Sequence, residues 1–248
     1  MLIPALSLDT EPARALRLPL AGFTTLDAEA FPGRRAAVIY LQGCPLQCGY
    51  CENGTMMAPR RGESGEWEAV ETYLASRLDR LEAVVFSGGE PTLHADLPEA
   101  VARVRGLGLS VGLHTAGPYP ERLARLLPWL DWVALDVKGR GHDFDRIGGR
   151  PGVWRRHARS LEALLAGDVA FECRTTVHWR DFELADVERL AMTLADCGVR
   201  RYALQVARTE RCQDPDYCRP VPGAPSRETL EALARRLCPH FDHLALRH

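Results

Sequence analysis

Residues 39–53, IYLQGCPLQCGYCEN, place three cysteines directly after an apolar run. Cys44, Cys48 and Cys51 follow a C-x3-C-x2-C spacing, and the glycines and the proline among them predict a loop. Four thiolates would complete the ligand set of a [4Fe–4S] cluster, whereas three leave one iron open to a small molecule. The stretch therefore predicts a reactive iron–sulfur site with Cys44, Cys48 and Cys51 as metal ligands.

A structural zinc site is the alternative interpretation of the three cysteines. Zinc would need a fourth Cys or His at short range, usually as part of a second closely spaced pair. The next histidines are His94 and His114, and each stands beside a predicted strand of its own. The spacing thus favours a cluster over zinc without excluding zinc.

Composition limits the class of protein. The chain has 248 residues, 46% of them hydrophobic and 26% charged, which suits one large α/β domain. We expect a single domain over 1–248, with a core at about 22–207 and a C-terminal extension at 208–248. A net charge of −2 gives no electrostatic support for binding nucleic acid or a membrane surface. The start lacks the pattern of a signal peptide, so we expect a cytoplasmic, reducing location.

Strands and helices are predicted to alternate along most of the chain. The predicted strands are 36–42, 83–87, 110–115, 132–138, 169–177 and 201–207, and 243–247 is a candidate for a short final strand. The predicted helices are 66–80, 95–107, 119–128, 153–166, 183–197 and 226–238. Such alternation indicates βα units around a parallel sheet. Six units are too few for a closed eight-strand barrel, so we expect an open, partial (β/α)6 barrel with its helices outside.

Polar motifs stand where these strands end, which is where α/β folds bind ligands. Gly88, Gly89 and Glu90 follow the second strand in SGGEP, and the bland alternative is a simple strand-to-helix turn. Asp136 and Lys138 end the fourth strand on one face, and their alternative is an ion pair at the barrel rim.

Three further strands end in candidate site residues. His114 and Thr115 close the third strand, where His114 either faces a ligand or is an ordinary hydrogen-bonded histidine. Arg174 and Thr176 share one face of the fifth strand, and Gln205 lies in the sixth. An arginine within FECRTTV is not typical of a solvent-facing position.

The cysteine spacing with an aromatic residue before the last cysteine resembles the signature of the radical S-adenosylmethionine (SAM) enzymes. The resemblance implies a [4Fe–4S] cluster and SAM as cofactors. It also implies the SAM amino group near the backbone of Gly88 and Gly89 and the carboxylate of Glu90, with Asn53 and Thr115 close by. It further implies that Lys138, aligned by Asp136, binds the SAM carboxylate. Arg174 is suited to contact SAM or a peptide backbone, and Gln205 is expected near the adenosine.

Within that superfamily, residues 31–51 and the D-x-K segment are similar to the proteins that activate anaerobic ribonucleotide reductase and pyruvate formate-lyase. The resemblance implies an oxidoreductase that installs a glycyl radical on a partner enzyme, with a flavodoxin or ferredoxin as electron donor. His114 and Ala116 depart from the acidic residue and the Asn that the family often has there.

Two other functions stay open. One is a radical SAM enzyme for a small molecule, such as a 7-carboxy-7-deazaguanine synthase, and the other is a non-catalytic Fe–S or zinc protein. Cys212 and Cys218, with five residues between them, lie in a later loop without a third close ligand, so we predict free thiols there.

Overall fold

In the part of the chain that the computed structural model describes, residues 15–60, 62 and 66–247, eight strands form one sheet that keeps the order of the sequence. The strands are β1 (Leu20–Asp27), β2 (Ala36–Leu41), β3 (Ala83–Gly88), β4 (Ser110–Thr115), β5 (Trp132–Asp136), β6 (Ala170–Val177), β7 (Arg201–Val206) and β8 (His243–Arg247). Neighbours from β2 to β8 are parallel, whereas β1 runs antiparallel to β2. The predicted α/β class, an open and mainly parallel sheet, is confirmed.

The sheet has one strand more at each edge than the six predicted strands, which makes eight. The candidate final strand is confirmed as β8, which pairs with β7. Strand β1 was not predicted, because its sequence LAGFTTLD lacks a clean alternation of apolar and polar residues. It pairs with β2 through a register that shifts twice, so tertiary pairing rather than local pattern forms it.

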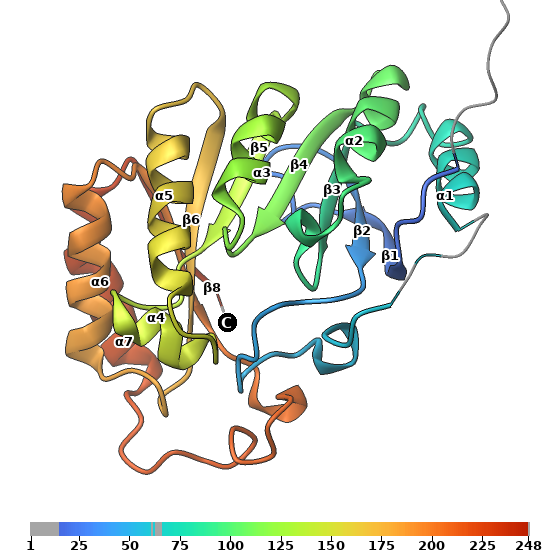
Figure 1. The fold of residues 1–248 in the computed structure, drawn as a ribbon. Coiled ribbons are helices and arrows are strands. Elements are labelled where there is room, and N and C mark those ends of the chain that lie inside the picture. The colour runs from blue at the N-terminus through green and yellow to red at the C-terminus, as the bar shows by residue number, and fades with distance from the viewer. Residues whose placement is uncertain (1–14, 61, 63–65, 248) are drawn as a thin grey trace, which may run out of the picture.

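Helices cover one face of the sheet. They are α1 (Glu66–Ala75), α2 (Leu97–Gly106), α3 (Pro120–Leu126), α4 (His142–Ile147), α5 (Val153–Leu165), α6 (Leu184–Asp196) and α7 (Arg227–Leu237). Figure 1 shows α2, α3, α5 and α6 side by side along the sheet. Helix α4 was not predicted because its six residues, placed between glycines, are too few to show a helical period. Among the described helices, none has the length and apolar character needed to cross a membrane.

Side chains of alternating strand positions form two hydrophobic clusters, one on each face of the sheet. The larger cluster lies under the helices and contains Trp67 and Phe86, whose ring centres are 6.1 Å apart. The smaller one gathers Val38, Val85 and Trp132 around Phe31, which follows β1. Apolar side chains thus fill part of the inner face, and the carboxyl ends of the strands carry the polar residues described next.

Candidate active site

A cavity of about 220 Å³ opens at the carboxyl ends of the central strands. The following predicted site residues line it: Cys44, Cys48, Cys51, Asn53, Gly88, Gly89, Thr115, Asp136 and Lys138. Among the predicted site residues, all within the described part of the chain, Glu90, Arg174 and Gln205 do not line it. The fold therefore brings together residues that lie far apart in the sequence.

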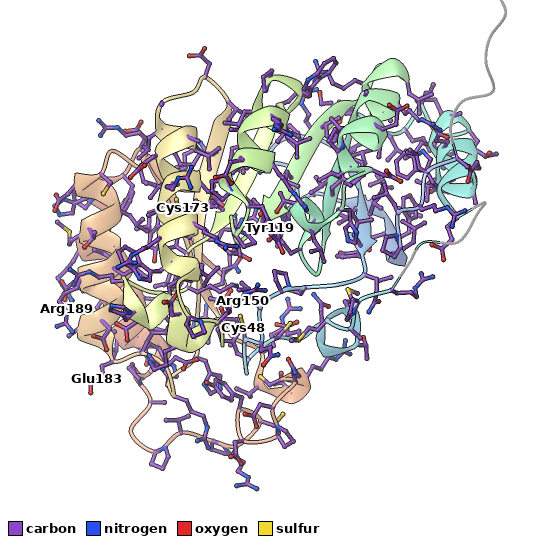
Figure 2. The ribbon with its side chains drawn as sticks, viewed as in Figure 1. Cys48, Tyr119, Arg150, Cys173, Glu183 and Arg189 are labelled. Atoms are coloured by element: carbon purple, nitrogen blue, oxygen red, sulfur yellow. The ribbon has the colours of Figure 1, made fainter. Side chains whose placement is uncertain are left out.

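Residues 42–57, here called the cysteine loop, are tied to the protein at both ends and in the middle. The Gly43 amide donates to the Met56 carbonyl at 2.6 Å, which closes the loop. The Gln47 amide donates to the Gly148 carbonyl at 2.8 Å, which ties the middle to the turn after α4. Figure 2 shows Cys48 below the ends of the strands. The loop is thus a fixed wall of the cavity.

Burial keeps two of the thiols of this wall, those of Cys44 and Cys48, in the protonated form. Burial, followed by the nearby Glu90 carboxylate, raises the pKa of Cys44 to about 12, and burial also raises the pKa of Cys48. Such thiols stay protonated until a cation displaces the proton. Within the described residues, no three His, Cys, Asp or Glu side chains converge on one metal position. All three thiols line one cavity, and the cysteines of a [4Fe–4S] cluster each bind a separate iron, so these side chains can serve as its ligands.

Gly88 and Gly89 let the end of β3 approach the cysteine loop. Gly88 has φ +107°, and a Cβ there would lie 2.4 Å from the Leu41 amide nitrogen. A Cβ on Gly89 would lie 2.2 Å from the Gly43 carbonyl oxygen. Any side chain at either position would displace backbone. Gly88 is therefore required where β3 meets the end of β2, and Gly89 is required for the contact with the loop.

Glu90 does not line the cavity and lies buried behind its wall. Its fully buried carboxylate accepts hydrogen bonds from the Thr92 amide at 3.0 Å, the Thr115 hydroxyl at 2.7 Å and the Ala116 amide at 2.9 Å. Burial raises the pKa of Glu90, and these donors oppose that shift. The carboxylate joins the end of β3 to the end of β4 and so shapes the cavity wall. A direct contact with SAM remains a prediction.

Lys138 is the only lysine in the sequence, and all the other residues among its Lys and Arg are arginines. Its Nζ lies 3.7 Å from Asp136 Oδ2 and 3.4 Å from the Tyr50 hydroxyl. Burial acts to lower the pKa of Lys138, but the Asp136 carboxylate and the Cys48 thiolate, once metal binding has removed its proton, act to raise it, and the pKa lies well above its usual value. The ammonium is therefore a charged donor, and it can donate to an anion in the cavity.

His114 lines the cavity and is hydrogen-bonded as well, and contact with a ligand stays a prediction. Its Nε2 lies 2.8 Å from the Ala30 carbonyl oxygen, which only accepts, so Nε2 carries the proton. Nδ1 faces the Ser87 hydroxyl at 3.5 Å. Burial, with the Arg174 charge, lowers the pKa of His114 to about 3. The ring is thus a neutral polar group of the wall.

A second cavity of about 170 Å³ adjoins the first, and Glu52 and Thr176 line both. Gln205 lines this second cavity, where its amide donates to the Thr176 hydroxyl at 3.1 Å. Arg247 of β8 lines it too. The polar space therefore continues from the cysteine loop toward the last two strands.

Arg174 lies in a charged cluster beside both cavities. Its Nε donates to Glu172 at 2.9 Å, and Arg247 pairs with the same fully buried carboxylate at 3.0 Å. Arg174 Nη1 lies 3.4 Å from His114 Nε2, which already donates to a carbonyl, and Nη2 is buried with no partner in the described part of the structure. One carboxylate thus serves two guanidinium groups.

Glu172, Arg247 and Ser87 were not predicted from the sequence. Glu172 stands two residues before Arg174, and this period of two was a usable signal for a shared strand face. Registers place Thr176 opposite Gln205 and Gln205 opposite Arg247. Such registers are set by the assembled sheet, so the sequence offered no signal for Arg247.

Comparisons with known proteins agree with this geometry. The family model of the radical SAM superfamily matches residues 38–170, more than half of the chain. The chain belongs to the radical SAM superfamily. Its activity is therefore radical SAM chemistry, and the family implies a [4Fe–4S] cluster and SAM.

Two radical SAM relatives come from Methanocaldococcus jannaschii. A protein provisionally named a glycyl-radical enzyme activating enzyme is 29% identical over 240 residues, covering 92% of this chain and 95% of that protein. A 7-carboxy-7-deazaguanine synthase is 26% identical over 183 residues, covering 67% of this chain and 72% of that protein. The two names point to different substrates.

Solved structures share the fold. QueE from Escherichia coli superposes with a TM-score of 0.57 at 21% identity, covering 93% of each chain. SuiB from Streptococcus suis, bound to the precursor peptide SuiA, has a TM-score of 0.65 at 15% identity. That match covers 84% of this chain and 48% of SuiB, so this chain spans about half of SuiB. At these identities the likeness concerns the fold alone.

Proposed function

We propose that this radical SAM enzyme installs a glycyl radical on a partner enzyme such as an anaerobic ribonucleotide reductase. The similarity along nearly the whole chain to an archaeal protein provisionally named as such an activator carries the proposal. Asp136 and Lys138, in the segment that resembles activating enzymes, both line the cavity. A flavodoxin or ferredoxin would deliver the electron.

Each part of the cavity has a role in this proposal. Cys44, Cys48 and Cys51 would hold the [4Fe–4S] cluster, and Lys138 would hold the carboxylate of SAM. When bound, cluster and SAM supply the reductive cleavage that yields methionine and a 5′-deoxyadenosyl radical. The protein's own part is to orient SAM and to exclude water, and Tyr50, buried beside Lys138, contributes to the second task.

The second cavity suits the glycine-bearing segment of the partner. It adjoins the first cavity, and its wall carries Thr176, Gln205 and Arg247. Amide, hydroxyl and guanidinium groups can donate to the carbonyls of an extended peptide. In this proposal they would hold the peptide while the first cavity holds SAM.

Electron paramagnetic resonance tests the proposal directly. The reconstituted protein would be incubated anaerobically with SAM, a reductant and a glycyl radical enzyme encoded in the same genome. A glycyl radical signal on the partner should form with the wild type and be lost with Cys48→Ala. Cleavage of SAM without any radical on the partner would contradict the proposal.

A small-molecule substrate is the second candidate function, and the similarity to a 7-carboxy-7-deazaguanine synthase favours it. Here the second cavity would hold the small molecule instead of a peptide. The substrate of that synthase would then be turned over by the reconstituted protein in the absence of any partner protein. The same preparation can be used for both tests.

A further inference from the structure

Residues 208–219, here called the C-terminal strap, lie against the cysteine loop. They belong to the long connection between β7 and α7 and contain a single 3-10 turn, Thr209–Arg211. Figure 1 shows this connection in orange below the ends of the strands, next to the blue cysteine loop. Arg208 at the start of the strap lines the second cavity, and residues 209–219 have no part in the function proposed above.

Two backbone hydrogen bonds join the strap to the cysteine loop. The Gln213 amide donates to the Cys51 carbonyl at 2.9 Å, and the Asp214 amide donates to the Gly49 carbonyl at 3.1 Å. The two carbonyls belong to the residues on either side of Tyr50, and one of them is that of Cys51, the last cysteine of the motif. The strap therefore fixes the backbone that carries Cys51.

Gly49 is needed for space rather than for an unusual backbone conformation. Its φ does not lie in the left-handed range that favours glycine. A Cβ on Gly49 would lie 2.3 Å from Cε2 of Tyr217 and 2.7 Å from two further ring atoms. The Tyr217 ring therefore packs directly on the backbone of the cysteine loop.

Tyr217 is itself held by the body of the protein. Its carbonyl accepts a hydrogen bond from His178 Nε2 at 2.9 Å, and the two ring centres are 4.6 Å apart. The Arg180 amide donates to His178 Nδ1, so the Nε2 proton is fixed. The Tyr217 hydroxyl donates to Asp181 at 3.0 Å, and Arg146 pairs with the same carboxylate at 2.9 Å. The ring cannot turn away without breaking these contacts.

We propose that Tyr217 is a positioning residue for the cluster, because its ring and the strap hold Gly49 and Cys51 in a ligand-ready conformation. Ordering a loop costs conformational entropy, and the strap removes that freedom before metal binds. The inference rests on the assignment of the cluster to Cys44, Cys48 and Cys51. It assigns a function to a segment that does not line the first cavity.

Rescue by a second substitution tests the contact. Gly49→Ala, Tyr217→Ala and the double variant would be reconstituted with iron and sulfide, and iron loss to a chelator would be timed. Residues that support metal ligands typically affect affinity by 10- to 100-fold, so Gly49→Ala should lose iron about tenfold faster than the wild type. The double variant should lose iron more slowly than Gly49→Ala, because removal of the ring frees space for the new methyl group.

Tyr217→Phe is the matched control, since it keeps the ring and removes only the hydroxyl. It should lose iron more slowly than Tyr217→Ala and should not rescue Gly49→Ala. Thermal unfolding of the iron-free variants, compared with the wild type, separates a loss of fold from a loss of positioning. Tyr217→Ala introduces no clash, so it tests the proposal even where Gly49→Ala does not fold.

The outcomes distinguish a failure of the cluster assignment from a failure of the positioning role of Tyr217. If the wild type takes up no cluster, the cysteine assignment fails and the role of Tyr217 fails with it. If the wild type binds the cluster but Tyr217→Ala retains iron as well as the wild type, only the positioning role is overturned. A double variant as labile as Gly49→Ala would likewise overturn it.

Discussion

Replacing Lys138 by methionine should weaken SAM binding and leave the cluster in place. Within the described residues the ammonium has two polar contacts, 3.7 Å to Asp136 and 3.4 Å to Tyr50, both beyond the usual hydrogen-bond range of about 2.7–3.2 Å. Most of its donor capacity is therefore free for the SAM carboxylate. A charge-assisted hydrogen bond contributes about 1.5–3 kcal/mol, which corresponds to a loss of about 10- to 150-fold in affinity.

The fold should tolerate this change. Methionine has nearly the length of lysine, and the Asp136 side chain is 42% exposed, so no buried charge is left unpaired. We expect the free energy of unfolding to fall by less than about 1 kcal/mol, because an apolar side chain replaces the buried ammonium and the partly exposed Asp136 carboxylate stays in contact with solvent. The cysteine loop is a separate element, so the iron content should equal that of the wild type.

Titrating SAM into the reconstituted variant while following the cluster spectrum measures both effects. Lys138→Arg is the matched control, because it keeps the charge and changes the shape of the donor. Since the chain has one lysine, an amine-selective reagent modifies only Lys138 and the amino terminus. SAM should protect Lys138 from this reagent. Wild-type affinity in Lys138→Met would remove the residue from the SAM site, and a missing cluster would make its role structural.

Four further outcomes are expected. Cys48→Ala should abolish cluster binding and SAM cleavage, and retention of both would refute the cysteine assignment. A Cys212→Ser, Cys218→Ser double variant should keep its iron and sulfide, and a loss of about four irons per chain would reveal a second cluster. Glu172→Gln should lower the free energy of unfolding by about 3 kcal/mol, because it leaves two guanidinium groups without their buried carboxylate. A denaturant titration that finds no change would contradict this. Burial lowers the pKa of His157 to about 4, below its unfolded value of about 6.5. The free energy of unfolding should therefore fall by ~2 kcal/mol from pH 7 to pH 5, and His157→Gln should remove that part of the pH dependence.

The sequence by itself determined the fold class and most of the first cavity. Apolar runs alternating with amphipathic helices are local patterns, and they require a parallel sheet with helices outside. The motifs of the first cavity stand at the ends of those strands, and the ends of parallel strands meet at one edge. Cys48, Gly88 and Lys138 could therefore be placed near one another without coordinates.

Only the tertiary structure decided the edge strand β1, the orientation of Glu90 and the charged cluster around Glu172. Local pattern did not predict β1, which forms through pairing with β2. Glu90 turns inward because backbone and hydroxyl donors from the end of β4 surround its carboxylate. Arg247 meets Glu172, 75 positions away, through a register that no local pattern encodes. These features depend on contacts between distant segments, and such contacts exist only once the chain has folded.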